Sequence, residues 1–98
     1  MKTIDDIKKI LIAHRRELQQ SFNVEKIGIF GSFARGDTTA SSDVDILVGL
    51  SKPMGWEIVD LHDRLQNLLG MKVDLVTMGA VRRKKILWES IQEDLVNV

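Results

Sequence analysis

Three aspartates carry the clearest chemical signal in this sequence. Asp43 and Asp45 are two residues apart in the segment DVDILVGL, which is typical of a β-strand, so both carboxylates would point to the same face. Asp74 stands between Val73 and Leu75 in another predicted strand, where an unpaired charge would be costly. If the two strands are neighbours, the three carboxylates converge, and their hard oxygen atoms suit Mg²⁺ together with substrate phosphates. For Asp43 and Asp45 alone, the alternative is that they only cap the exposed start of the strand.

The glycine-rich segment before these acids could bind phosphate. Gly31 and Ser32 directly follow a predicted strand, and backbone N–H groups at such a turn favour an anion, as does the serine hydroxyl. Gly31 and Gly36 nearly fit the P-loop spacing, but Asp37 stands where that motif needs a lysine and would repel phosphates. We therefore exclude a P-loop and keep the strand–turn site, with an ordinary turn as the alternative. Arg35 either reaches the phosphates or pairs with Asp37.

Apolar periodicity and turn residues predict the elements that would position these side chains. Thr3 and Asp6 resemble a capping box at the start of the first helix, and Gly70 stands where a helix-ending glycine belongs. The alternation of helices and strands predicts an α/β (α+β) fold, a small mixed sheet with helices packed on at least one face. The expected helices span residues 3–21, 56–69 and 81–93, and the expected strands span residues 24–30, 43–50 and 71–77, with a short extended segment at the end.

Length and composition limit the class of protein. The chain has 98 residues, 44% of them hydrophobic, which predicts one domain over residues 1–98 with a real core. The sequence contains no cysteine, which excludes disulfides, thiolate zinc sites and thiol nucleophiles. No apolar run approaches the roughly 18 residues that span a bilayer. The N-terminal segment does not have the pattern of a signal peptide, so we expect a cytoplasmic protein.

Charge is balanced overall but unevenly distributed. The 14 basic and 14 acidic side chains cancel, which argues against a general nucleic-acid or membrane coat. The acids are in excess between residues 36 and 80, and three of them are the candidate metal ligands. The strongest basic run, Arg82 to Lys85, is either a solvated helix start or a surface for an acidic partner, RNA or phosphate, because its cations oppose the dipole of the helix that they begin.

The remaining aromatic and imidazole side chains carry little functional signal. His14 and His62 have no metal-ligand spacing to each other, and we interpret both as structural or surface residues. Trp56 and Trp88 are predicted to be packing residues, with base stacking as the alternative. The candidate chemistry therefore rests on the glycine-rich segment and the aspartates.

These residues together resemble a known family. Gly31–Ser32, ten intervening residues and then Asp43–Val44–Asp45 resemble the signature of the polymerase-beta-like nucleotidyltransferases. The segment GSFARGDTTASSDVDILV looks like that of the minimal nucleotidyltransferases, the small stand-alone members of this superfamily, and the resemblance covers nearly the whole chain. It implies a small α/β enzyme that transfers a nucleoside monophosphate, AMP from ATP, to a hydroxyl group.

The resemblance also implies roles for the matching residues. Gly31 and Ser32 would bind the triphosphate, with Arg35 as a further candidate. Asp43 and Asp45 would bind Mg²⁺. Asp74 would complete the metal site and act as, or assist, the general base. The protein in such an enzyme mainly positions the reactants and neutralises charge.

A partner protein follows from the same resemblance. Minimal nucleotidyltransferases of this size are often encoded beside a small helical HEPN protein, which is a toxin and often an RNase. The resemblance implies that this chain is the antitoxin and transfers AMP to a tyrosine of that toxin. Two alternatives stay open: a non-catalytic binding antitoxin, and an aminoglycoside-type transferase for a small molecule. The sequence leaves open whether the chain forms a homodimer or a hetero-oligomer.

Overall fold

The computed structural model, which describes residues 2–39 and 41–98, contains a four-stranded sheet in the order β3-β2-β1-β4. β1 (Val24–Phe30) is antiparallel to both of its neighbours, β2 (Val44–Leu50) and β4 (Val96–Asn97). β3 (Val73–Thr77) pairs with β2 in parallel, because the helix α4 (Glu57–Leu69) carries the chain back between them. The predicted small mixed sheet is confirmed, and β3 lies at its edge.

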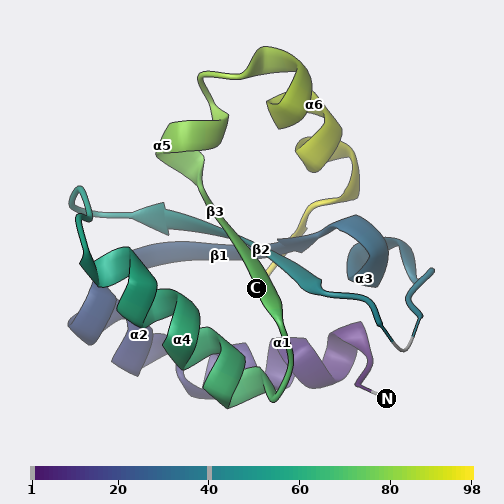
Figure 1. Cartoon of the computed structure of the whole chain (residues 1–98), viewed down its shortest axis with the longest axis horizontal. Coiled ribbons are helices and arrows are strands. Elements are labelled where there is room, and N and C mark those ends of the chain that lie inside the picture. Colours follow the sequence, from purple (N-terminus) through teal and green to yellow (C-terminus); the bar gives the residue numbers. More distant parts are fainter. Residues whose placement is uncertain (1, 40) are drawn as a thin grey trace.

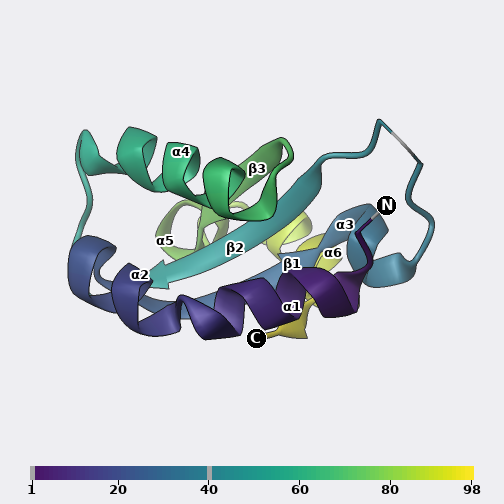
Figure 2. The ribbon, with the colours of Figure 1, turned by 90° about the horizontal axis from the view of Figure 1, so that it is seen from below.

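Helices cover both faces of this sheet. α1 (Ile4–Ala13), α2 (Arg15–Phe22) and α4 lie on one face, and α5 (Met78–Val81) and α6 (Lys85–Asp94) lie on the other (Figure 1). Seen from below, α1, α2 and α4 stand in front of the sheet, and α6 lies behind it (Figure 2). The short helix α3 (Gly31–Arg35) continues directly from β1. Among the residues that the structure describes, no helix is long and apolar enough to cross a membrane.

Side chains alternate along β2 between two separate cores. Val44 and Ile46 are fully buried in the larger core, under α1, α2 and α4. Leu47 points the opposite way and belongs to the smaller core, which holds α5 and α6. Asp45 shares the face of Leu47, so its carboxylate leaves the sheet on the side of α6. Outside β2, the fully buried side chains of the larger core are Ile7, Leu11, Leu18, Ile29, Leu61, Leu65 and Leu69.

The first predicted helix is divided in two. The capping box is confirmed: the Thr3 hydroxyl accepts from the Asp6 N–H, and the Asp6 carboxylate accepts from the Thr3 N–H. The prediction of one helix over residues 3–21 is wrong at His14, whose φ of −108° and ψ of 9° interrupt the helical backbone. The apolar periodicity survives this interruption, because Leu18 of α2 is still buried beside α1.

The last predicted helix is also two helices. The Thr77 hydroxyl accepts from the Ala80 N–H at 3.3 Å, which starts α5 at Met78, three residues earlier than the pattern predicted. The chain then turns after Val81, and α6 begins at Lys85. The basic run therefore lies in the turn and at the first position of α6. The extended segment expected at the end is confirmed as β4.

Candidate active site

Asp45 and Asp74 are direct neighbours across the two parallel strands. In the β2–β3 register, the Cα atom of Asp45 pairs with that of Asp74, so both side chains leave the same face of the sheet. Asp43 immediately precedes β2, two residues from Asp45. Asp43 and Asp74 are exposed, and Asp45 is half-buried. The structure thus places Asp45 beside Asp74, as the sequence predicted for neighbouring strands, with Asp43 just before β2.

The surroundings of Asp45 disfavour its negative charge. Burial raises the pKa of this carboxyl above its ordinary value, and the nearby carboxylates of Asp74 and Asp43 raise the pKa further. Arg35 is the positive group that acts in the opposite direction. Negative charge is therefore concentrated at this end of β2 and β3, where a cation would be stabilised.

Gly31 lies against the Asp45 carboxylate. The antiparallel register pairs Phe30, the last residue of β1, with Asp45, and the chain then enters α3 at Gly31. Gly31 has a φ of +73°, and a Cβ atom added to it would lie 2.1 Å from the Asp45 Oδ2 atom. Ser32 follows in the first turn of α3, where its carbonyl accepts from the Gly36 N–H. The predicted phosphate-binding pair and the predicted metal ligands are therefore adjacent.

Arg35 at the end of α3 is held by two carboxylates. Its Nε atom donates to Asp37 Oδ2 at 3.1 Å, and its Nη1 atom donates to Asp94 Oδ2 at 2.9 Å. These two hydrogen bonds raise the pKa of the Arg35 guanidinium further above its already high value. The Asp37 pairing was the stated alternative to phosphate binding. The Asp94 contact links α3 to α6, and nothing in the sequence signals it, because the two residues are 59 positions apart.

Asp74 is exposed and not buried, contrary to the expectation from the sequence. The sequence suggested a costly charge inside a strand, but β3 is an edge strand and Asp74 is exposed on it. Its location beside Asp45, rather than its burial, is what distinguishes this acid. Among the described residues, no three acidic or histidine side chains are already gathered closely enough to hold a metal ion. The metal-binding role of Asp43, Asp45 and Asp74 stays a prediction.

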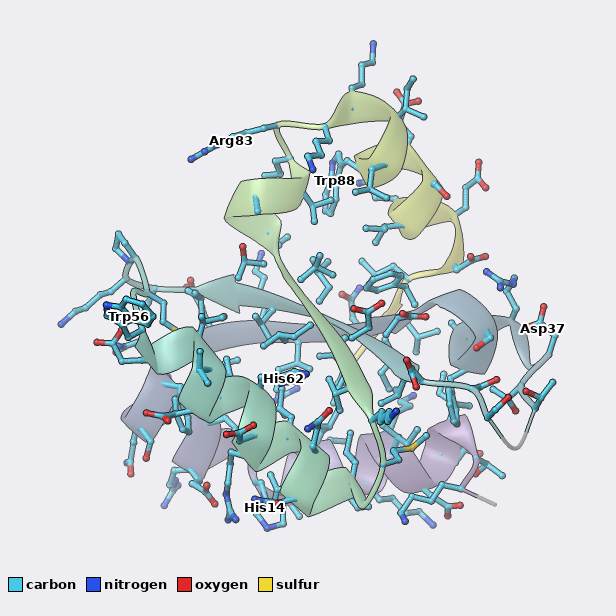
Figure 3. The ribbon with its side chains drawn as sticks, viewed as in Figure 1. His14, Asp37, Trp56, His62, Arg83 and Trp88 are labelled. Carbon is cyan, nitrogen blue, oxygen red and sulfur yellow. The ribbon has the colours of Figure 1, made fainter. Side chains whose placement is uncertain are left out.

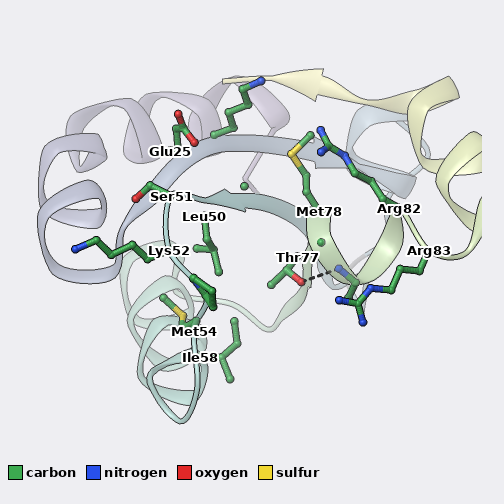
Figure 4. A pocket seen from close by; sticks show the side chains of 15 residues that line it. Glu25, Leu50, Ser51, Lys52, Met54, Ile58, Thr77, Met78, Arg82 and Arg83 are labelled. Carbon is green, nitrogen blue, oxygen red and sulfur yellow. Dashed lines mark hydrogen bonds between the residues drawn. The ribbon is translucent and has the colours of Figure 1, made fainter.

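A hollow of about 830 Å³ lies at the opposite end of β2 from these acids (Figure 4). It is bordered by Gly49 and Thr77 near the ends of β2 and β3. Gly49 follows Asp45 by four residues, which corresponds to about 13 Å along a strand. The hollow is thus separate from the carboxylates. Its cationic side chains are Lys26, Lys52, Arg82 and Arg83.

Both histidines bond to the backbone, as their structural interpretation predicted. The His62 Nε2 atom donates to the Val73 carbonyl at 2.6 Å, which fixes α4 against the start of β3. The His14 Nδ1 atom donates to the Ile10 carbonyl at 2.9 Å, within α1. Figure 3 shows both residues on the α1–α4 side of the sheet.

The two tryptophans differ in how they are packed. Trp88 points inward between α5 and α6, where the Arg82 guanidinium carbon lies 5.9 Å from its ring centre (Figure 3). Trp88 packs against the smaller core, as predicted. The packing prediction is wrong for Trp56, which is 90% exposed because it lies in the loop just before α4, outside both cores.

Comparison with known proteins places the chain in a family. A family model described as a nucleotidyltransferase domain matches residues 11–97. The chain belongs to the nucleotidyltransferase family. This nucleotidyltransferase is 46% identical over 99 residues to a Methanocaldococcus jannaschii protein provisionally named a protein adenylyltransferase, and the match covers 100% of both chains. It is 42% identical over 83 residues to the protein adenylyltransferase MntA of Thermococcus cleftensis, which covers 84% of each chain.

Solved structures confirm the fold of this nucleotidyltransferase. It superposes with a TM-score of 0.73 on a chain of a toxin–antitoxin crystal structure with AMP-PNP, at 22% identity over 94% of this chain and 71% of that one. The TM-score is 0.66 with a chain from a tri-AMPylated Shewanella oneidensis HEPN toxin in complex with MNT antitoxin, at 18% identity over 93% of this chain and 70% of that one. At these identities the likeness establishes the nucleotidyltransferase fold.

Proposed function

We propose that this chain uses Mg²⁺ and ATP to transfer AMP to a tyrosine hydroxyl of a HEPN-family partner, and so acts as an antitoxin. The observation that carries this proposal is the paired register of Asp45 and Asp74, with Gly31 against the Asp45 carboxylate. Carboxylates and a glycine turn are the parts that a nucleotidyl transfer needs beside each other.

The residues at this site fit a magnesium ion. Their donors are carboxylate oxygens, which Mg²⁺ prefers, and the pKa of Asp45 is raised first by burial and then by the neighbouring carboxylates of Asp74 and Asp43. Bound there by Asp43, Asp45 and Asp74, the ion would neutralise charge on the triphosphate and lower the pKa of the attacking hydroxyl. Exposure of Asp43 and Asp74 leaves their oxygen atoms accessible to a cation and to substrate.

The chain's own groups bind and orient the reactants. Gly31 lets the triphosphate approach the backbone, and Ser32 adds a hydroxyl donor. The acceptor oxygen forms a bond to the α-phosphorus, while the bond between this phosphorus and the pyrophosphate oxygen breaks. Asp74 takes the proton of the acceptor hydroxyl. Arg35 binds the phosphates after it leaves at least one of its two carboxylate partners.

The relatives support the choice of acceptor. MntA of Thermococcus cleftensis is named a protein adenylyltransferase, and it aligns with 84% of this chain. Proteins of the same fold occur in toxin–antitoxin complexes, one of them with a tri-AMPylated HEPN toxin. We further propose that residues 1–98 form one nucleotidyltransferase domain.

Transfer of label from ATP tests the proposal. The purified chain is incubated with ATP labelled at the α-phosphate, Mg²⁺ and the HEPN-family protein encoded beside it. We expect label on that protein, and we expect none when its tyrosines are replaced by phenylalanine. Asp45→Asn and Asp74→Asn should each lower transfer by about 10²–10⁴-fold, the range for loss of a catalytic proton acceptor or charge. Asp60→Asn, an exposed acid on α4, is the matched control.

The alternatives give different results in the same experiment. A non-catalytic binding antitoxin would leave the partner unlabelled, and Asp45→Asn would still protect cells from the toxin. A small-molecule transferase would label an added aminoglycoside and not the partner. Either result would contradict the proposal and support the corresponding alternative.

A further inference from the structure

The first turns of α6 expose apolar side chains that the proposed reaction does not use. Ile86 is 85% exposed and Leu87 is 43% exposed. Together with Lys84, Lys85 and Ser90, they line a shallow, mainly apolar depression, and we call these five residues the α6 patch. Neighbouring large apolar side chains with this exposure mark surfaces that bind partners.

Positive charge borders the α6 patch. Arg83 extends away from the turn between α5 and α6 (Figure 3), and Lys84 and Lys85 follow it directly. Within residues 2–39 and 41–98, none of these three cations has an acidic side chain at ion-pair distance. α6 also has no acidic residue in its first turn, so the cations oppose its dipole. An acidic partner would offset this local cost.

The α6 patch is connected to the candidate active site through α6. α6 runs from the patch to Asp94, which binds Arg35 beside the carboxylates. Leu87 and Asp94 are seven residues apart, which is about 10 Å along a helix. A protein bound to the patch could therefore extend along α6 toward Arg35 and the carboxylates of Asp45 and Asp74.

We propose that the α6 patch docks an acidic segment with an apolar face, carried by the partner that accepts AMP. This inference rests on the proposed function and names the surface that selects the acceptor. Further along the same exposed side of α6 lie Glu89 and Glu93. The face is therefore positive at its start and negative toward its end, and this polarity fixes the direction in which the segment binds.

Substitutions in the α6 patch have close counterparts on α1. Lys84→Glu/Lys85→Glu reverses the cationic border, and Lys8→Glu/Lys9→Glu makes the same change on the other side of the sheet. Ile86→Glu removes the apolar contact, and Ile12→Glu is its control, because Ile12 is 55% exposed. Acids at the start of α6 favour the helix dipole, so weaker binding by the first variant would not reflect unfolding.

The measurements are the dissociation constant for the HEPN-family partner encoded beside this chain, and the rate of AMP transfer at saturating partner. We expect both patch variants to weaken binding at least about tenfold, as for a central interface contact, and both α1 variants to bind within about twofold of wild type. Transfer at saturating partner should stay at the wild-type rate.

Several outcomes would overturn the docking surface. These are patch variants that bind like wild type, α1 variants that weaken binding equally, or a wild-type chain that does not bind the partner. Loss of single-stranded RNA binding in the Lys84→Glu/Lys85→Glu variant, with partner binding intact, would assign the patch to nucleic acid. If the partner binds through the patch but receives no AMP, the proposed function fails and the docking surface stands.

Discussion

At the scale of single residues, Gly31 combines two separate requirements. Its φ of +73° favours glycine, and the space beside it is occupied by the Asp45 carboxylate. The sequence indicated Gly31 only as a place where phosphate could approach the backbone. The structure adds that any side chain here would displace a predicted metal ligand. The effect of the backbone conformation on stability can therefore be separated by experiment from the effect of the displaced carboxylate on activity.

Gly36 provides the matched comparison. It has a φ of +81°, and nothing lies within 4 Å of a Cβ atom added to it. Alanine at either position meets the same unfavourable backbone, so we expect Gly31→Ala and Gly36→Ala each to lower the free energy of unfolding by about 1 kcal/mol. Only Gly31→Ala should also abolish AMP transfer, because it moves the Asp45 carboxylate. Urea denaturation and the labelling assay measure the two effects, and equal loss of transfer in both variants would contradict this explanation.

The raised pKa of Asp45 gives a prediction for stability. A folded protein with a raised carboxyl pKa holds the proton more tightly than the unfolded chain does, so ionisation of Asp45 destabilises the fold. This destabilisation is complete above the raised pKa and is relieved as the pH falls through that pKa and below the ordinary one. Without metal, Asp45→Asn should therefore raise the melting temperature by a few degrees at pH 7, and the gain should disappear near pH 3.

At pH 7 with Mg²⁺, the wild-type chain should have a higher melting temperature than the Asp45→Asn variant. Added Mg²⁺ binds the folded wild-type chain and raises its melting temperature, while the Asp45→Asn variant gains little. Asp60→Asn on α4 should respond to Mg²⁺ like wild type. A wild-type melting temperature that is insensitive to millimolar Mg²⁺ would argue against a metal site at these acids.

At the scale of elements, local patterns predicted the strands better than the helix ends. The turn residues and apolar runs predicted β1, β2 and β3 nearly to their bounds, and they placed Asp45 and Asp74 on strands. The breaks at His14 and after Val81 left the apolar period intact, so periodicity could not detect them. The Thr77 cap of α5 was a readable signal, since threonine often starts a helix in this way.

Contacts between distant elements were beyond prediction from the sequence. The sequence predicts that the aspartates converge only if β2 and β3 are neighbours, and the structure shows that these strands pair in parallel. The link from Arg35 to Asp94 depends on how α6 crosses the sheet, which no local pattern encodes. This link matters because Arg35 on α3 is a candidate phosphate ligand, with pairing to Asp37 as the alternative.

The ion pair between α3 and α6 leads to a prediction for nucleotide affinity. Asp94 competes with phosphate for the Arg35 guanidinium, so Asp94→Asn should tighten ATP binding. Because Arg35 is about half exposed and Asp94 is partly exposed, the ion pair is weak and the gain should be at most about fivefold. Calorimetry with α,β-methylene ATP and Mg²⁺ measures affinity without transfer, since the bond that AMP transfer breaks is blocked. Glu93→Gln, the neighbouring acid, is the control, and weaker binding by Asp94→Asn would show that the pair positions Arg35 instead.

At the scale of the whole molecule, two cores of different size share one sheet. The larger core unites α1, α2 and α4 with three strands, and it contains nearly all of the fully buried side chains. The smaller core has three buried residues, Leu47, Val81 and Ile91, and it attaches α5 and α6 over the face that bears the acids. The face that bears the acids is therefore covered by the less extensively packed layer, which can open with a smaller loss of contacts.

Substitutions in the two cores should separate local opening from global unfolding. Leu65→Ala leaves a cavity in the larger core, and we expect it to lower the free energy of unfolding by about 3 kcal/mol and to speed amide hydrogen exchange throughout the sheet. Ile91→Ala should speed exchange mainly in α5 and α6, because it weakens the attachment of that layer while the larger core stays packed. It should also weaken partner binding, since the α6 patch then lacks a fixed position. Exchange that rises equally in α4 and α6 after Ile91→Ala would mean that the two cores unfold as one unit.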